Sequence, residues 1–239
     1  MEAMALGVNE EMPILKANRL SSGIPDLDIL LEGGYYNPGN IIMIGPSGME
    51  KAAFAYHFAA SAGANENAYI ICGNSSPADI MNKASTLGVN LNKPNVFFID
   101  CYSSTLGKPQ EGDPKKIKMV MGPGALNDIS LMLNEATQES TGKKMRVVFD
   151  TLSTFVLYNP QDSIRKFLSV IEGRLKSVGA TAIYLVDEGV HDKQVLSLIS
   201  HGMDETYTIA DKGGKFVMIL PELDLQVPIK VGPAGVTIL

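Results

Sequence analysis

Short apolar runs alternate with longer amphipathic stretches along the chain up to about residue 200. The apolar runs cover residues 40–44, 68–72, 95–100, 146–150 and 182–186, and they predict buried strands. Residues 51–62, 77–87, 124–139 and 162–178 repeat their apolar positions with helical period and predict helices. This alternation is typical of a mostly parallel sheet with helices on both faces. We therefore expect binding sites beyond the carboxyl ends of the strands.

The pattern changes in the last forty or so residues of the chain. Short apolar segments at 204–209, 215–220, 229–231 and 236–239, with turns at 212–214 and 233–235, predict antiparallel strands that extend the sheet. Residues 103–123 are rich in Ser, Gly and Pro and hold four lysines, so we expect a mobile loop there. Residues 1–18 read as an N-terminal arm, which leaves 19–239 as a single domain.

Composition limits the classes of function. The chain has 239 residues, of which 45% are hydrophobic, enough for one core, and its 26 acidic and 20 basic residues give a net charge of -6. An acidic total argues against a dedicated nucleic-acid or anionic-membrane surface. Cys72 and Cys101 lack zinc-ligand spacing and are too few for a disulfide scaffold, which fits the cytoplasm. We find no secretory signal and no apolar run long enough to cross a bilayer.

The most informative segment is a strand, a glycine-bearing turn and a helix with an early lysine, over residues 41–52. A working phosphate-binding loop has glycine, four variable residues, glycine, lysine and then Ser or Thr. Backbone N–H groups cradle the phosphates, the lysine neutralises them and the hydroxyl holds magnesium. The candidate nucleotide-binding residues are Gly45, Pro46, Ser47, Gly48, Met49, Glu50, Lys51, Ala52 and, at the end of a later strand, Asp150. Glu50 replaces the second glycine, and Ala52 replaces the hydroxyl residue.

Two further segments stand beside this loop. Residues 22–34 read SGIPDLDILLEGG, and residues 146–153 read RVVFDTLS. Together with the loop they resemble the RecA superfamily and, within it, the KaiC-like ATPases of archaeal type, over about residues 19–239. The resemblance implies a RecA-like three-layer α/β fold, with a central sheet flanked by helices and antiparallel C-terminal strands. It also implies ATP and magnesium as the cofactors of active members, which form rings or filaments with a nucleotide between protomers.

The chain departs from the family pattern at four places. Besides Glu50 and Ala52, residues 74–77 read NSSP where the resemblance implies a pair of glutamates before the proline, and the strand at 217–222 lacks a Lys-x-Arg pair. We therefore expect no catalytic residue, no metal site and no bound ATP or magnesium. The chain reads as a degenerate, catalytically inactive homologue, a regulatory or scaffolding subunit in signal transduction. It is expected to assemble with itself or with an active paralogue.

The charge of Glu50 has a calculable effect. A carboxylate about 4 Å from a phosphate oxygen costs about 4 kcal/mol at an effective dielectric constant of 20. That energy corresponds to about a thousandfold in affinity. Glu50 could instead turn to solvent or pair with Lys51, and pairing would cancel the cation. Either arrangement weakens the binding of a triphosphate.

Other interpretations stay open. Lys51 and the backbone N–H groups of residues 47–52 could still hold a nucleotide in a slow ATPase. A cluster of three lysines in the 103–123 loop (Lys115, Lys116 and Lys118) could bind single-stranded nucleic acid. Lys51 could also be a solvated helix residue, and Asp150 a helix or turn cap. Residues 74–76 are expected to cap the helix that begins at Pro77, because no histidine is placed to activate a serine there.

Overall fold

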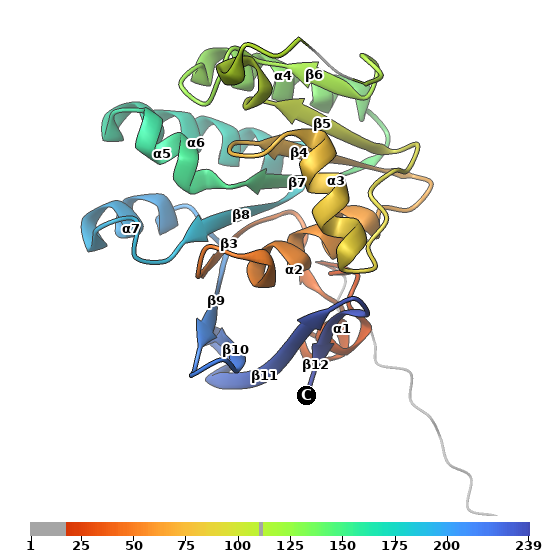
Figure 1. Ribbon diagram of the computed structural model, residues 1–239, viewed down its shortest axis with the longest axis vertical. Helices are drawn as coiled ribbons and strands as arrows, with labels where there is room; N and C mark the ends of the chain where they lie inside the picture. The colour runs from red at the N-terminus through yellow and green to blue at the C-terminus, as the bar shows by residue number, and fades with distance from the viewer. Residues whose placement is uncertain (1–17, 110–111) are drawn as a thin grey trace, which may run out of the picture.

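The computed structural model describes residues 18–109 and 112–239 (Figure 1). Its main sheet has ten strands in the order β12-β11-β10-β9-β3-β8-β7-β4-β5-β6, and β1 and β2 form a separate pair. The strands are β1 (Arg19–Leu20), β2 (Tyr35–Tyr36), β3 (Gly39–Gly45), β4 (Glu66–Cys72), β5 (Val96–Asp100), β6 (Ile117–Met119), β7 (Lys144–Asp150), β8 (Thr181–Asp187), β9 (Glu205–Asp211), β10 (Phe216–Leu220), β11 (Leu225–Gly232) and β12 (Gly235–Ile238). From β9 to β6 every pairing is parallel, and β10, β11 and β12 pair antiparallel. This mixed sheet confirms the expected fold class.

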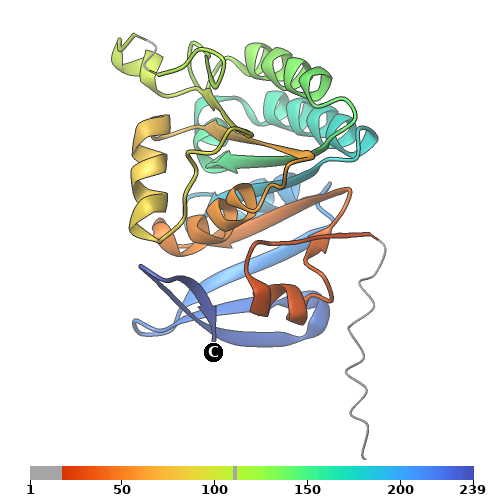
Figure 2. The same cartoon turned by 90° about the vertical axis from the view of Figure 1, so that its right-hand side faces the viewer.

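Helices cover both faces of the sheet. They are α1 (Pro25–Leu30), α2 (Met49–Ala60), α3 (Pro77–Thr86), α4 (Leu126–Glu139), α5 (Leu152–Tyr158), α6 (Gln161–Ser177) and α7 (Lys193–Ser200), with short 3-10 turns η1 (Ser103–Leu106) and η2 (Pro221–Leu223). Figure 2 shows α3 on one side of the sheet and α4 and α6 on the other. The buried apolar residues accordingly form two clusters, one under α1, α2 and α3 and one under α4 to α7. The fold therefore has three layers.

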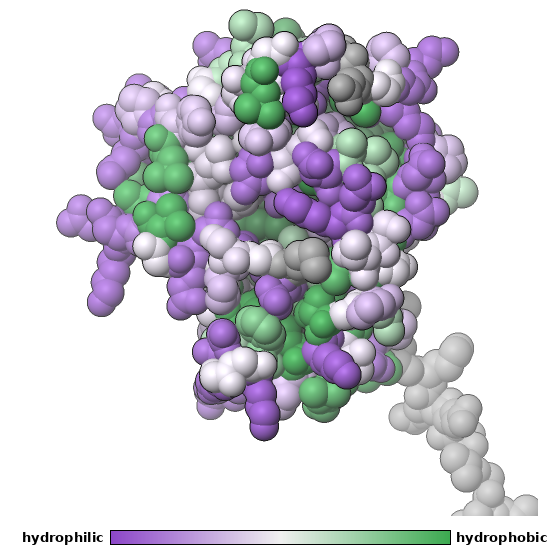
Figure 3. All heavy atoms as spheres, viewed as in Figure 1, coloured by the Kyte–Doolittle hydropathy of each residue, from purple (hydrophilic) through white to green (hydrophobic). Residues whose placement is uncertain are grey.

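The central helix α2 is buried on nearly all sides. Its sequence MEKAAFAYHFAA is rich in alanine, and Phe54, Tyr56 and Phe58 are at most 1% exposed. Alanine favours the helix and allows close packing against the sheet. Helix α6 instead buries one face, made of Ile164, Phe167, Leu168, Ile171 and Leu175, as its sequence period predicts. Most of the residues exposed on the face shown in Figure 3 are polar, and an apolar patch lies beside α5.

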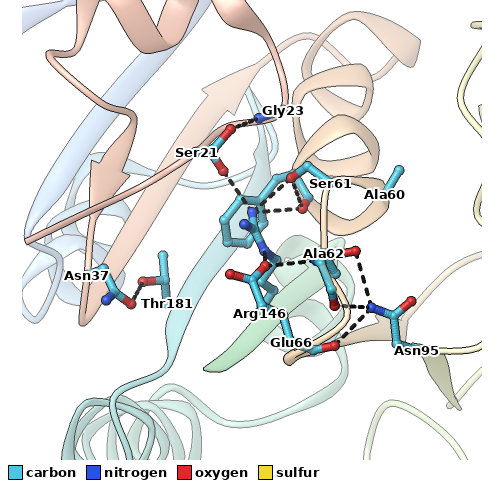
Figure 4. A network of polar contacts seen from close by, with 12 residues as sticks. Ser21, Gly23, Asn37, Ala60, Ser61, Ala62, Glu66, Asn95, Arg146 and Thr181 are labelled. Atoms are coloured by element: carbon cyan, nitrogen blue, oxygen red, sulfur yellow. Dashed lines mark hydrogen bonds and ion pairs between the residues drawn. The ribbon is translucent and has the colours of Figure 1, made fainter. Parts of the chain in front are cut away.

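Buried polar groups tie the segment before α1 to the sheet and to α2 (Figure 4). Arg146 of β7 forms an ion pair of 2.8 Å with Glu66 of β4. The same guanidinium group donates to the carbonyl oxygens of Ser21 and Phe58 and to the hydroxyl of Ser61. One buried cation therefore joins two strands, the end of α2 and the segment that precedes α1.

The segment at 103–123, which the sequence predicts to be a mobile loop, contains two short pieces of regular structure. Residues 103–106 form η1, and residues 117–119 form β6, which pairs with β5. A strand of three residues carries too little periodic pattern to be read from sequence. The sequence analysis also missed α1, α5 and α7, which are short helices. The proposed arm over 1–18 lies, except for its last residue, outside the described residues.

Candidate nucleotide site

A cavity of about 240 Å³ opens beyond the carboxyl ends of β3, β4, β7 and β8. Its lining residues are Ser47, Gly48, Lys51, Ala52, Tyr56, Asn74, Lys83, Asp150, Thr151, Leu185 and Asp187. Five of the nine residues that the sequence analysis proposed therefore line one cavity. The cavity stands where α/β folds of this type bind their ligands.

The turn from β3 into α2 has the form of a phosphate-binding loop. Gly45 ends β3, and a Cβ at this position would lie 2.9 Å from the carbonyl oxygen of Ile209, so the neighbouring strand β9 requires glycine here. Helix α2 begins at Met49, immediately after Gly48. Glu50 folds back over this turn, because its Oε2 occupies the space that a Cβ on residue 48 would need. The Glu50 carboxylate thus covers the loop without lining the cavity.

Lys51 is buried, and its charge is already neutralised within the protein. The residue is 3% exposed, and its Nζ donates to Asp187 Oδ1 at 2.6 Å and to the carbonyl oxygen of Pro46 at 2.7 Å. The interpretation of Lys51 as a solvated helix residue is therefore wrong, and its acidic partner is Asp187 and not Glu50. Asp187 is the last residue of β8, the strand beside β3.

Asp150 is held by a hydrogen bond from the neighbouring helix. Tyr56 Oη donates to Asp150 Oδ2 at 3.0 Å, and Asp150 is 8% exposed. Burial raises the pKa of Asp150, while the hydrogen bond from Tyr56 and the charge of Lys83 oppose that rise. The cap of α5 is Thr151, whose hydroxyl accepts from the N–H of Ser153. The reading of Asp150 as a helix cap is therefore wrong.

The segment after β4 brings polar side chains to the cavity. Asn74 lines it at the place where the resemblance implies a glutamate. Ser76 caps α3 in a reciprocal arrangement with Asp79, which confirms the expected cap. Lys83, one helical turn further along α3, donates from Nζ to Ser75 Oγ at 2.9 Å and lines the cavity.

The sequence analysis missed four polar residues of this site, namely Tyr56, Lys83, Thr151 and Asp187. Tyr56 stands five residues after Lys51 on a helix that is buried all round, so no polar face marks it. Asp187 directly follows the apolar run at 182–186, and a carboxylate at the end of a predicted strand was the available signal. The sequence pattern around Lys83 does not distinguish it from a solvated lysine on a helix.

Several residues of this cavity differ from those with which a phosphate-binding loop holds magnesium and ATP. Ala52 offers a methyl group where the metal-binding hydroxyl would stand, and Asp150 Oδ2 accepts from a tyrosine. The lysine that would bind phosphate contacts Asp187 instead. In the part of the chain that the structure describes, no group of three or more His, Cys, Asp or Glu side chains is placed to hold a metal ion.

Comparison with known families agrees with this architecture. A family model described as "ATPase: KaiC" matches residues 20–206. The chain belongs to this KaiC family. The "UPF0273 protein" of Thermotoga maritima is 22% identical over 192 residues, which cover 78% of this chain and 77% of that protein.

A solved structure supports the same fold. The KaiC-like protein of the hyperthermophilic archaeon Pyrococcus horikoshii OT3 superposes with a TM-score of 0.71 at 17% identity, covering 92% of this chain and 98% of that one. At this identity the likeness concerns the RecA-type fold of the KaiC family. Within residues 18–109 and 112–239, no helix has the length and apolar character of a membrane span.

Proposed function

We propose that this KaiC-family chain is a non-catalytic regulatory or scaffolding subunit that acts in cytoplasmic signal transduction. The observation that carries the proposal is the ion pair of 2.6 Å between Lys51 and Asp187 inside the phosphate-loop cavity. The Asp187 carboxylate already pairs with the Lys51 ammonium group, which a bound triphosphate would need as its own partner. The protein thus supplies its own anion to this lysine.

The strength of this pair sets the expected loss of affinity. The side chain of Lys51 is 4% exposed and that of Asp187 is 14% exposed. Separating a buried ion pair so that one charge loses its partner costs about 3–5 kcal/mol. A triphosphate that recruits Lys51 must offset this cost, which corresponds to roughly two to four orders of magnitude in affinity.

Two groups that ATP hydrolysis needs are also replaced. General-base assistance by a placed carboxylate is worth about 10²- to 10⁴-fold in rate. Asn74 lines the cavity at the position in question, and an amide does not accept a proton from water. Ala52 provides no hydroxyl for a metal ion. Two losses on separate elements, α2 and the segment after β4, support a non-catalytic role.

The partner follows by analogy with the fold family only. A chain that keeps the RecA-type frame can keep the assembly surfaces of its relatives while it loses turnover. We therefore propose self-association or association with an active KaiC-family paralogue. Light scattering of the purified protein, alone and mixed with that paralogue, measures the assembly directly.

The decisive experiment measures ATP binding and turnover with and without magnesium. We expect no turnover and no gain in ATP affinity on adding magnesium, and we expect the double variant D187N/K51M, which removes both charges of the pair, to leave any residual binding unchanged. In D187N the released Lys51 should bind ATP at least tenfold more tightly than in the native protein, and the double variant D187N/K51M should lose that gain. Magnesium-dependent turnover that K51M abolishes would overturn the proposal.

A working nucleotide-binding protein or slow ATPase is the second candidate. It is favoured by the intact turn at residues 45–48 and by the position of Lys51 in the lining of the cavity. The hypothesis that Lys115, Lys116 and Lys118 bind single-stranded nucleic acid finds less support. Lys118 pairs with Glu135 and Glu139, and Lys116 Nζ donates to the carbonyl oxygen of Lys93, so two of its three lysines are engaged within the fold.

A further inference from the structure

A second cavity lies at the amino-terminal edge of the central strands, away from the phosphate loop. Its volume is about 650 Å³, within the range of about 300–1,000 Å³ typical of small-molecule sites. Asn40, near the start of β3, lines this cavity, whereas the phosphate loop follows Gly45 at the end of the same strand. Helix α6 and the end of α7 supply the rest of the lining. The two cavities have no lining residue in common.

The side chain of Asn40 is fully buried, and only one of its two polar atoms has a partner. Its Oδ1 accepts a hydrogen bond of 3.2 Å from Tyr184 Oη, but its Nδ2 has no acceptor among the residues that the structure describes. The adjacent Asp204 carboxylate is engaged elsewhere, because Oδ2 accepts from the Asn40 main-chain N–H at 2.8 Å and Oδ1 from Lys176 at 2.6 Å. A buried donor without an acceptor costs free energy, so a ligand that brings an acceptor removes that cost.

Glu172 of α6 supplies a second donor to this cavity when its carboxyl group is protonated. Burial, with a smaller contribution from Asp204, raises the pKa of Glu172 to about 7, and the charge of Lys176 opposes that rise. Two other titratable groups face this region. Tyr184 on β8 has its own pKa raised by burial and then by the charge of Glu172, and His201, after α7, lines the cavity. Near pH 7 the carboxyl group of Glu172 is therefore balanced between donor and anion.

The amino-terminal half of α6 brings two cations to the same cavity. Arg165 and Lys166 precede Glu172 by about two helical turns, which places them roughly 10 Å along the helix axis. The ion pair of Arg165 with Asp162 is exposed and 3.8 Å long, and in the part of the chain that the structure describes no ion pair includes Lys166. Leu198 of α7 adds apolar lining. The cavity thus offers donors and positive charge at two places, with apolar surface besides.

We propose that this cavity is a second ligand site, which holds a small dicarboxylate. One carboxylate accepts hydrogen bonds from Asn40 Nδ2 and from the protonated carboxyl group of Glu172. The other pairs with Arg165 and Lys166, and the carbon chain lies against the apolar lining. Two donors match the two oxygens of a carboxylate, whereas a phosphate group brings three acceptor oxygens and would leave one of them without a donor. The site does not depend on the non-catalytic assignment, because it lies outside the nucleotide cavity.

The test is calorimetric titration of the full chain with glutarate at low ionic strength, at pH 6 and at pH 8. With a pKa of about 7, Glu172 is protonated in about nine-tenths of the molecules at pH 6 and in about one-tenth at pH 8. Glutarate should therefore bind about tenfold more weakly at pH 8. In E172Q the amide donates at both pH values, so the affinity should change by less than about threefold and should exceed that of the native chain at pH 8. Histidine also titrates in this range, and H201Q should keep the native pH dependence.

Further variants test the two ends of the site. R165M/K166M should weaken glutarate binding at pH 6 by about tenfold, because it removes the charged donors for one carboxylate. K212M/K215M, which removes two exposed lysines of the turn between β9 and β10, is the matched control and should bind as the native chain does. N40A should abolish binding. Circular dichroism verifies that each variant is folded, and E172Q and R165M/K166M decide the matter if N40A is not.

Titrations with acetate and with inorganic phosphate identify the ligand class. Both should bind at least tenfold more weakly than glutarate, since acetate engages only one end of the site and phosphate leaves an oxygen without a donor. Glutarate binding that R165M/K166M weakens and that E172Q makes independent of pH supports the site. Absence of saturable glutarate binding at pH 6, phosphate that binds as tightly as glutarate, or a pH dependence that E172Q retains overturns it.

Discussion

Tyr56 of α2 and Asp150 of β7 meet through a hydrogen bond of 3.0 Å between the phenol and the carboxyl group. The two residues are 94 positions apart in the chain, and both are buried. This bond holds the helix that carries Lys51 against the strand whose end forms the floor of the cavity. It engages Oδ2, one of the two carboxylate oxygens of Asp150.

The variant Y56F tests how much this bond stabilises the fold. Removing the donor leaves a buried carboxyl group without its partner, which costs about 1–3 kcal/mol. The bond lowers the pKa of Asp150, so its loss matters most where the charged carboxylate is populated. The difference in unfolding free energy between Y56F and the native chain should therefore shrink as the pH falls. Urea unfolding at several pH values measures it, and Y158F, at an exposed tyrosine on α5, should be neutral.

A second pH effect is expected at the other end of the sheet, at Glu172 of α6. Burial, with a smaller contribution from Asp204, raises the pKa of Glu172 to about 7, and its carboxyl group packs against the Cα of Gly202. The fold thus prefers the protonated carboxyl. Its contribution to stability is present below the ordinary pKa of a glutamate, near 4.5, and is lost as the pH rises to about 7.

E172Q removes this titration while it keeps the shape of the side chain. The stability of the native chain should fall relative to that of E172Q between about pH 4.5 and 7, and the gap should be constant above that range. Urea unfolding of both proteins in the same buffers gives the difference. Parallel stability curves across this range would show that Glu172 titrates normally.

The positions of the central strands along the chain and the place of the phosphate loop could be predicted because their signals are local. The buried runs at 40–44 and 146–150 fall inside β3 and β7, and Gly45 and Lys51 lie where a phosphate loop requires them. Helix α6 was readable from its apolar period. Each of these features is encoded within one continuous segment.

The chemistry of the cavity could not be predicted, because it depends on contacts between distant segments. Asp187 lies 136 residues after Lys51, and only the pairing of β3 with β8 brings the two together. The orientation of Lys83 depends on how α3 packs beside α2. The sequence analysis predicted that the charge of Glu50 decides phosphate binding. In the structure, Lys51 instead pairs with Asp187, and Glu50 covers the turn at Gly48.

Arg146 offers a test of the buried network that supports α2. R146M should lower the free energy of unfolding by about 3–5 kcal/mol, because it leaves Glu66 without its cation and removes a donor from two carbonyl groups. R146K should recover part of this loss, since an ammonium keeps the charge but lacks the forked geometry of the guanidinium. Thermal unfolding of the three proteins ranks them. Equal loss in both variants would mean that the geometry, and not the charge, carries the stabilisation.

Gly23 tests whether the lead-in segment, residues 22–34, is fixed on α2 by close backbone contact. It has φ of +81°, and a Cβ there would collide with the carbonyl oxygen of His57 and lie 2.9 Å from the Cβ of Ser61. G23A should cost about 1–2 kcal/mol for the left-handed backbone and about 1–3 kcal/mol more for the collision. Gly213 is the matched control, because its φ is +69° and nothing lies within 4 Å of a Cβ there.

G213A should therefore lose only the free energy of the left-handed backbone. The difference in unfolding free energy between the two alanine variants isolates the contact with α2. Urea unfolding with an unchanged m-value gives both free energies. If G23A and G213A destabilise equally, the lead-in segment is free to move away from α2, and the contact with His57 contributes nothing. If G23A is the weaker protein, residues 22–34 are fixed on the helix that carries Lys51, so a change in this segment can reach the cavity through α2.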